Sequence, residues 1–408
     1  DNWIGTEPYG KYFEAIGIDS VVGSVGNGTT LRMISDIPGV KYTEGRFLPY
    51  FFPDVFCEEG DPVTEAKENW IQGRRAIMQS PLDRIGYGGD LSLALQFPEF
   101  VDVVERISNE FHTFHEMVQG TKGYKAPFKV AILNCFGKLR SWQTNQVAHA
   151  LWYKEIYSYV GVLEALSGMT FDVEFINFED IKQNGISEEI GIMINSGDAM
   201  TAWSGGENWL DETVITTIRE WVYNGGGFIG IGEPTAIQHQ GKYFQLFDVL
   251  GVDKDITYGL SYRKYHELTK EHFILEDIKT EIDFGRGMRG VFKKGEHTTI
   301  LAMDQNDILL SVNEYGRGRG VYIAGLPYSA QNARLLQRAI YYAAHQESEL
   351  MTYYVDSCEV ECTYFPEVKK LAVYNNSFEV QEAQIYVRGE VKHRITLNEM
   401  DLIWLDVE

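Results

Sequence analysis

Cysteine is scarce in this chain, and its spacing excludes the common metal and redox motifs. The 408 residues include four cysteines, Cys57, Cys135, Cys358 and Cys362. No two of them form a CxxC pair or a Cys/His zinc pattern. We therefore predict free thiols and no metal site, as is usual for a cytoplasmic protein.

Long apolar runs and excess positive charge are also missing. No segment approaches the roughly 20 apolar residues that a membrane-spanning helix needs, and the N-terminus lacks the pattern of a signal peptide. Lysine and arginine number 36 against 59 aspartates and glutamates, which gives a net charge of −23. Because nucleic acids bind basic surfaces, we expect neither a nucleic-acid nor a membrane partner.

The residues that are abundant suit a large globular protein. Hydrophobic residues make up 44% of the chain and aromatic residues 13%, which is ample for buried cores. A chain of 408 residues is too long for one ordinary core, so two or three domains are expected. We predict domains at 1–122, 123–346 and 347–408, with a Gly/Pro/Lys-rich linker at 120–127.

The middle region alternates strands and helices. We predict buried strands at 130–133, 171–176, 190–194 and 228–231, helices at 144–167, 211–224 and 330–345, and a hairpin of strands 307–313 and 320–324. Such alternation indicates a parallel sheet covered by helices. From about 347 onward only strands are predicted, at 353–364, 370–375, 383–388 and 401–407, which indicates a small β-sandwich-like domain.

Residues 1–122 read instead as mixed loop and helix. One short strand is predicted at 18–22, and helices at 63–79 and 98–118, the latter from apolar residues at helical spacing. A strand followed by a long functional loop is typical of the carboxyl end of a (β/α)₈ barrel. We therefore expect the C-terminal part of such a TIM-like barrel, with its upstream segment on the same or on a cleaved chain.

Acidic, arginine and aromatic residues crowd two runs near the start, Asp1–Tyr9 and Glu44–Pro53. Aromatic faces cover the apolar side of a pyranose, and carboxylate and guanidinium groups bind its hydroxyls. A buried irregular loop would have a similar composition. Between the two runs, residues 23–30 are rich in glycine and hydroxyl groups and can direct N–H donors at an anion, although the lysine of a P-loop is missing.

These two runs, and the stretch Val21–Ile37 between them, resemble the β-galactoside phosphorylases of glycoside hydrolase family 112. That family includes the lacto-N-biose/galacto-N-biose phosphorylases and the galactosyl-rhamnose phosphorylases. The resemblance implies inverting phosphorolysis of β-1,3-galactosyl-N-acetylhexosamine to α-D-galactose 1-phosphate, with phosphate as a substrate, no cofactor, and a homodimer. A galactosyl-β-1,4-rhamnose substrate is the alternative. A non-catalytic binding or dimerisation fragment is the alternative of another class.

The resemblance also implies roles for individual residues. Asp1 corresponds to the general acid, and Arg46, Tyr50 and Phe52 to positions that line the acceptor sugar. We expect Glu7 to bond a sugar hydroxyl or Arg46. For phosphate we predict the glycine-rich loop, because barrel phosphate sites lie at the ends of late strands; its candidate residues are Gly23, Ser24, Gly26, Asn27, Gly28 and Thr29.

The middle domain resembles the class I glutamine-amidotransferase-like fold, but it lacks the nucleophile. In that fold a cysteine sits on the sharp turn after a buried strand. Here the turn after strand 228–231 carries Gly232 and Glu233. Cys135 follows the first strand instead and is expected to be a small buried residue. We therefore predict an inactive domain that serves packing or dimer contacts.

Overall fold

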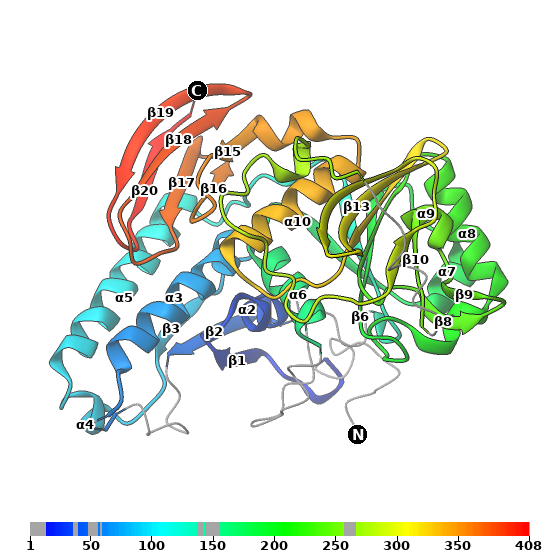
Figure 1. The fold of residues 1–408 in the computed structure, drawn as a ribbon. Helices are drawn as coiled ribbons and strands as arrows, with labels where there is room; N and C mark the ends of the chain where they lie inside the picture. The colour runs from blue at the N-terminus through cyan, green and yellow to red at the C-terminus, as the bar shows by residue number, and fades with distance from the viewer. Residues whose placement is uncertain are drawn as a thin grey trace. The chain divides into compact units, whose positions relative to one another are not determined.

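The computed structural model describes residues 14–35, 40–47, 56–57, 59–137, 142, 156–256 and 267–407. The chain divides into two compact units (Figure 1). The first contains Asp1–Lys125, Ser167–Thr170 and Tyr353–Glu408, and the second contains Ala126–Leu166 and Phe171–Thr352. The beginning and the end of the chain therefore belong to one unit, and the middle of the chain forms the other.

A small parallel sheet opens the first unit. Its strands are β1 (Ser20–Ser24), β2 (Tyr42–Phe47) and β3 (Arg84–Tyr87), in the order β1-β2-β3. Helix α2 (Gly28–Ser35) follows β1, α3 (Pro62–Gln79) lies between β2 and β3, and α4 (Leu91–Ala94) and α5 (Pro98–Val118) follow β3. Strand–helix alternation with parallel pairing is the unit of a (β/α)₈ barrel. The prediction of mixed loop and helix was thus incomplete, because β2 and β3 were not foreseen.

The two long helices have clear local causes. Asp61 caps α3 by accepting a hydrogen bond from the Thr64 N–H at 2.9 Å, and proline occupies the first helical position. Helix α5 also begins with a proline, Pro98, and ends at Gln119 in the left-handed conformation. Of the apolar stripe predicted from spacing, Phe100, Ile107, Phe111 and Phe114 are buried, while Val103 and Val104 are partly buried.

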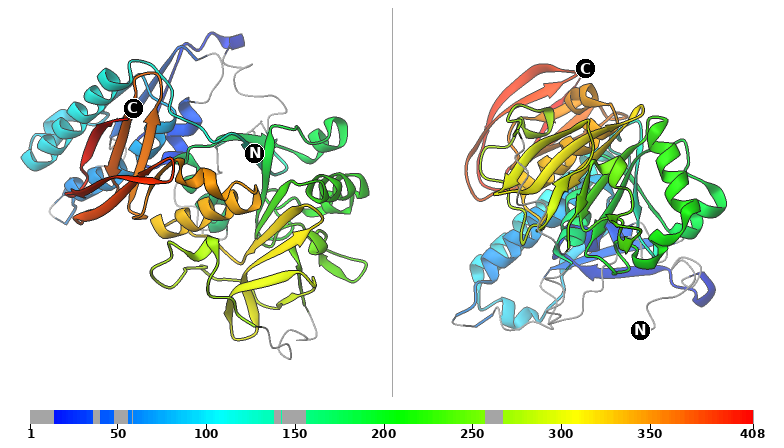
Figure 2. Two further views of the ribbon diagram at one scale, coloured as in Figure 1. Left: turned by 90° about the horizontal axis from the view of Figure 1, so that it is seen from above. Right: turned by 45° about the vertical axis from the view of Figure 1, so that its right-hand side comes forward.

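The C-terminal part of the first unit is a two-sheet sandwich. One sheet has the order β15-β18-β19, with bounds Tyr353–Val355, Gln381–Val387 and Glu390–Leu397; the other is β16-β17-β20, with bounds Val360–Phe365, Lys370–Asn375 and Leu402–Asp406. Apolar residues of both sheets form one core between them. The orange and red strands in Figure 2 show this module. The single strand predicted at 353–364 is wrong: it breaks at 356–359, and its halves join different sheets.

Two neighbouring arginines of α3 join the helices to this sandwich. Arg74 is completely buried. It donates to Glu110 Oε1 at 3.0 Å, to the Met400 carbonyl at 2.8 Å, to Asn376 Oδ1 at 3.1 Å and to the Asn375 carbonyl. The guanidinium group thereby satisfies backbone carbonyls of the sandwich that would otherwise be buried without a donor.

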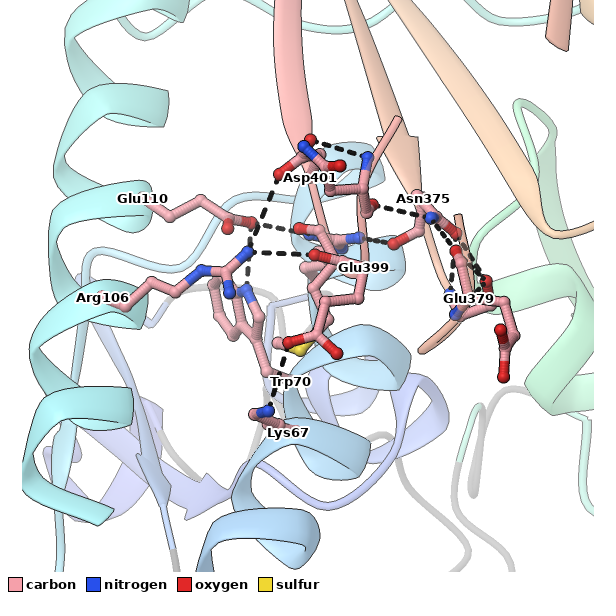
Figure 3. Close-up of polar contacts among 12 residues, drawn as sticks. Lys67, Trp70, Arg106, Glu110, Asn375, Glu379, Glu399 and Asp401 are labelled. Atoms are coloured by element: carbon pink, nitrogen blue, oxygen red, sulfur yellow. Dashed lines mark hydrogen bonds and ion pairs between the residues drawn. The ribbon is translucent and has the colours of Figure 1, made fainter. Parts of the chain in front are cut away.

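Arg75 makes a second link, because its Nε and Nη2 atoms bond both oxygens of Glu361 on β16 at 2.8–3.0 Å. Further polar contacts near this link are drawn in Figure 3. There Trp70 donates to Glu110 at 3.0 Å, Lys67 pairs with Glu399 at 3.3 Å, and Arg106 donates to the Glu399 carbonyl at 3.1 Å. The sandwich sheet β16-β17-β20 is therefore covered by helices on the face opposite its partner sheet.

The second unit is built on a seven-stranded sheet of order β12-β13-β14-β7-β6-β4-β5. The bounds are β4 Lys129–Leu133, β5 Asp172–Ile176, β6 Ile190–Gly197, β7 Gly227–Gly232, β12 Thr298–Asp304, β13 Asp307–Tyr315 and β14 Gly318–Ile323. Strands β14, β7, β6, β4 and β5 are parallel, and β12 and β13 are antiparallel additions. The parallel order is that of a doubly wound α/β fold, as the alternation predicted.

Helices cover both faces of this sheet. Helices α8 (Glu212–Tyr223) and α9 (Phe247–Leu250) contact it on one side, while α10 (Ala330–Ala343) lies on the other, as Figure 1 shows. The remaining elements are α6 (Tyr157–Ser167), α7 (Phe178–Asn184), the hairpin β8–β9 (Ala236–His239 and Lys242–Phe244), the pair β10–β11 (Val252–Lys254 and Val291–Lys293) and 3₁₀ helices at 206–210, 273–275 and 347–352. The helix predicted at 144–167 is seen from Tyr157; residues 143–155 lie outside the described part.

We predict that Arg74→Ala lowers the free energy of unfolding by about 3–5 kcal/mol, because the buried carbonyls of Asn375 and Met400 lose their donor and Glu110 loses its ion-pair partner. Urea unfolding followed by tryptophan fluorescence measures this change. Arg106→Ala is the matched control, since the Arg106 side chain is 43% exposed, and should cost less than about 1 kcal/mol. Equal losses for the two variants would contradict the role assigned to Arg74.

Candidate active site

Among the described residues, helices cover one face of the β1-β2-β3 sheet and leave the other without a helix. Val21 and Ile85 pack into the helical core, and a Cβ atom built on Gly45 would meet Val25 and Leu82 at 2.8–2.9 Å. Side chains alternate along a strand, so Val22, Glu44, Arg46 and Arg84 point to the other face. In a (β/α)₈ barrel the face away from the helices lines the interior, and active sites lie at its carboxyl edge.

Arg46 lies at that edge, near the end of β2. Its Nε atom donates to Glu44 Oε1 at 2.8 Å, and its side chain is 48% exposed, whereas that of Glu44 is 11% exposed. Arg84 approaches the other oxygen of Glu44, with Nη1 to Oε2 at 3.5 Å. Arg46 was predicted from the sequence, but Glu44 and Arg84 were not. Glu44 has the i, i+2 spacing that puts it beside Arg46, whereas Arg84 is placed only by the pairing of β2 with β3.

The glycine-rich segment lies directly beside Arg46. Strand β1 pairs with β2 so that Ser24 is opposite Arg46, and the Val25 N–H donates to the Arg46 carbonyl at 2.8 Å. Asn27 caps the next helix by accepting from the Thr30 N–H at 2.8 Å. The structure thus brings together two candidates that the sequence separates by about twenty residues.

The predicted phosphate loop is shorter than the run 23–30 suggested. Gly23 belongs to β1, and a Cβ atom there would lie 2.0 Å from Ile34 Cδ1, so this glycine permits helix packing. Gly28 and Thr29 are buried in the first turn of α2. The connection itself is Val25–Asn27, with Gly26 at its centre. What this segment presents to the site is therefore mainly the N-terminal end of a helix, which favours anions.

Four other predicted site residues, Asp1, Glu7, Tyr50 and Phe52, lie outside the described residues. Within the described part, the carboxylate that contacts Arg46 is Glu44. No group of three or more histidine, cysteine, aspartate or glutamate side chains in that part is placed to hold a metal ion. Searching the same residues for a helix long and apolar enough to cross a membrane finds none.

Comparison with known protein families shows to which family the chain belongs. The N-terminal TIM barrel domain of lacto-N-biose phosphorylase matches residues 1–126, the central domain matches 129–348, and the C-terminal domain matches 353–405. The chain belongs to the lacto-N-biose phosphorylase family. The resemblance seen in the sequence is confirmed, and so is the fold class of part of a barrel, a central α/β domain and a small β domain.

Named relatives span the chain almost completely. It is 53% identical, over 99% of its length, to a 1,3-beta-galactosyl-N-acetylhexosamine phosphorylase of Lachnoclostridium phytofermentans. It is 44% identical over 99% to the protein of that name from Bifidobacterium longum, and 35% identical over 95% to a D-galactosyl-beta-1->4-L-rhamnose phosphorylase of L. phytofermentans. The matches cover 56%, 58% and 54% of these relatives, so the chain spans little more than half their length.

A solved structure shares the fold at much lower sequence identity. The β-galactosidase of Rahnella sp. R3 superposes with a TM-score of 0.53 at 14% identity, covering 97% of this chain and 61% of that one. This similarity concerns the fold alone.

In the central domain of this lacto-N-biose phosphorylase family member, the turn after β7 carries a carboxylate and no cysteine. Glu233 follows Gly232, whose φ of +78° makes the sharp turn after β7. It accepts hydrogen bonds from the Ala199 N–H at 2.9 Å and the Tyr243 hydroxyl at 3.1 Å, and it pairs with Lys254. These contacts tie the turn to the β8–β9 and β10 segments.

The protonation states fit a structural role for this cluster. Burial alone would raise the pKa of Glu233, but the bonds from Lys254, Ala199 and Tyr243 hold that pKa below its usual range. Burial and the neighbouring Glu233 charge raise the pKa of Tyr243. Glu233 is therefore an ionised partner surrounded by donors, which is a poor nucleophile.

Cys135 does not replace the missing nucleophile. It follows β4, its Sγ lies 3.7 Å from the Gly205 carbonyl, and Asn208 donates to the sulfur at 3.3 Å. Burial raises the pKa of this thiol, and a reactive cysteine needs a lowered pKa. Cys135 was predicted to be a small buried residue; it is only partly buried, and its environment is that of an unreactive thiol.

We predict that iodoacetamide near neutral pH modifies Cys135 at least about tenfold more slowly than Cys57, because alkylation requires an accessible thiolate. Cys57 is exposed, whereas Cys135 is not. Peptide mass spectrometry over time measures both rates, and urea-unfolded protein, in which the two should react alike, is the control. Faster labelling of Cys135 in the folded protein would contradict its assignment as an inert residue.

Proposed function

We propose that the intact protein catalyses the inverting phosphorolysis of β-1,3-galactosyl-N-acetylhexosamine, giving α-D-galactose 1-phosphate and free N-acetylhexosamine. The observation that carries the proposal is the meeting of Arg46 with the β1–α2 connection at the carboxyl edge of the barrel sheet. Membership of the lacto-N-biose phosphorylase family supports the reaction type.

This reaction needs only one carboxylic acid from the enzyme. Hydrolysis with inversion uses a second carboxylate to activate water, whereas phosphate is already a competent nucleophile. In the proposed mechanism Asp1 protonates the glycosidic oxygen as its bond to the anomeric carbon breaks. Phosphate attacks that carbon from the opposite face, and no cofactor takes part.

The remaining residues bind and orient the reactants. Arg46 and the connection Val25–Asn27, with the helix end that follows it, are proposed to hold phosphate, because a guanidinium group and a helix N-terminus both bind oxyanions. Tyr50 and Phe52 are proposed to cover the apolar face of the sugar, and Glu7 to accept from its hydroxyls. Orientation of this kind lowers the entropic part of the barrier.

The first test is product formation from lacto-N-biose with and without phosphate. We expect α-galactose 1-phosphate only when phosphate is present. Asp1→Asn should lower turnover by about 10³-fold, the middle of the range for loss of a general acid, and leave circular dichroism unchanged. Release of free galactose without phosphate would make the protein a hydrolase and refute the mechanism.

An N-acetylhexosamine is the favoured acceptor, because the identities of 53% and 44% to proteins named for it exceed the 35% to the rhamnose phosphorylase. In the synthetic direction, galactose 1-phosphate should react with N-acetylglucosamine or N-acetylgalactosamine at least about tenfold faster than with rhamnose, the scale of discrimination that a few pocket contacts supply. Exclusive use of rhamnose would replace this assignment with the alternative.

Assembly and location complete the proposal. We propose a homodimer in the cytoplasm, and size-exclusion chromatography with light scattering tests the dimer. Assaying residues 1–408 beside the intact protein separates the non-catalytic alternative from the enzyme. If residues 1–408 form dimers but show no turnover, only the intact protein is catalytic.

A further inference from the structure

We propose that Glu44 is the positioning residue of an oxyanion site in which Arg84 is the second cation beside Arg46. The ligand is the phosphate of the proposed reaction, so the assignment rests on that function while adding residues to it. Arg84 lies outside the runs from which the reaction was inferred, and Glu44, the first residue of the run Glu44–Pro53, was given no role there.

The three side chains meet on the face of the sheet away from the helices. Glu44 lies directly opposite Arg84 in the register of β2 and β3, and Arg46 follows two residues later on the same face. One oxygen of Glu44 accepts from Arg46 Nε at 2.8 Å, and the other lies 3.5 Å from Arg84 Nη1. A buried carboxylate is retained only when it is paired, and each oxygen here has its own guanidinium group.

Contacts fix the aliphatic part of the Arg46 side chain as well as its guanidinium group. A Cβ atom on Gly88, in the segment after β3, would lie 2.9 Å from both Cβ and Cδ of Arg46. The backbone of Gly88 therefore packs against the methylene groups of Arg46, and only glycine permits this approach. With Nε held by Glu44, the guanidinium plane is oriented before a ligand arrives, which lowers the entropic cost of binding.

On the β3 side, the described residues leave room beside this oriented group. Gly86 is the β3 residue directly opposite Arg46, and a Cβ atom built there meets nothing within 4 Å. Among the described residues, the two terminal nitrogens of Arg46 have no hydrogen-bond partner, since its bonded atom is Nε. On β3, the strand position opposite Arg46 therefore carries no side chain that would cover it.

The charges favour an oxyanion over a neutral sugar hydroxyl. Two guanidinium groups around one carboxylate leave one positive charge in excess, and guanidinium groups bind phosphate through paired N–H donors. The N-terminal end of α2 lies on the neighbouring strand connection, where Asn27 caps it, and adds a positive partial charge. Phosphate is the oxyanion that the proposed reaction requires.

Asp83 supplies a matched control on the same two strands. Its carboxylate accepts from the Thr43 N–H at 2.7 Å and the Thr43 hydroxyl at 3.0 Å. Thr43 precedes Glu44, so its side chain points to the helix-covered face. Asp83→Asn therefore perturbs the pairing of β2 with β3 without touching the proposed site.

The test compares Glu44→Gln with Asp83→Asn in the intact protein, using steady-state kinetics and calorimetric titration with inorganic phosphate. For Glu44→Gln we expect the phosphate KM and Kd to rise about tenfold, the effect of losing one charged hydrogen bond, with the disaccharide KM unchanged. In a protein that already carries Arg46→Ala, adding Glu44→Gln should not raise the phosphate Kd further. Asp83→Asn should lower thermal stability and leave the phosphate Kd unchanged.

A second variant keeps the proposal testable if Glu44→Gln does not fold. Gly86→Val places a strand-compatible side chain in the open space, and Gly86 does not have a left-handed φ. It should abolish phosphate binding while the protein stays folded. Two outcomes would overturn the assignment. In one, Glu44→Gln and Asp83→Asn lose equal stability and the phosphate Kd does not change. In the other, only the disaccharide KM rises. Phosphate binding that weakens as expected in a protein without turnover would uphold this site and refute the proposed reaction.

Discussion

The burial of two adjacent guanidinium groups on α3 is the constraint around which the first unit is organised. Arg74 and Arg75 are inside the protein, and a buried charge is tolerated only when donors and acceptors match completely. The acceptors come from Glu110 on α5 and from residues 361–400 of the sandwich. Helix α3 can therefore be buried only when the helices of the N-terminal part pack against the C-terminal sandwich.

Helix α3 also packs against the candidate site. Gly73, the residue before Arg74, lies against Val25 and Leu31, because a Cβ atom on it would be 2.9–3.0 Å from them. Val25 in turn bonds the carbonyl of Arg46. Three successive residues of α3 thus contact the sandwich on one side and the β1–α2 connection on the other. The sandwich stabilises the barrel strands through this helix, although none of its residues is a candidate for catalysis.

Much of this fold could be predicted from local sequence. Helix α5 was foreseen at its observed bounds because Pro98 and an apolar stripe define it, and the buried strands of the central sheet were apparent from short apolar runs. Strands β2 and β3 were missed because Glu44, Arg46 and Arg84 occupy positions where a strand usually carries apolar residues, and glycine occupies 45 and 86. The residues that build the site are the ones that concealed its strands, as expected where function overrides local propensity.

Predicting the site was limited in a different way. Residue types in one run indicated Arg46 and the glycine-rich connection, but no sequence pattern links Glu44 with Arg84, forty residues apart, before the register of β2 and β3 is known. The break between β15 and β16 depends likewise on tertiary structure, since the chain changes sheets within a run of strand-forming residues.

The order in which the chain is synthesised gives the buried arginines a further significance. Arg74 emerges from the ribosome 301 residues before Asn375, whose carbonyl it finally bonds. Throughout that interval the central domain can fold, while the surface of α3 that awaits the sandwich stays uncovered. An apolar surface left open for so long would invite aggregation, whereas guanidinium groups remain hydrated until their acceptors arrive. The two guanidinium groups thus keep part of this surface hydrated during the delay that the topology creates.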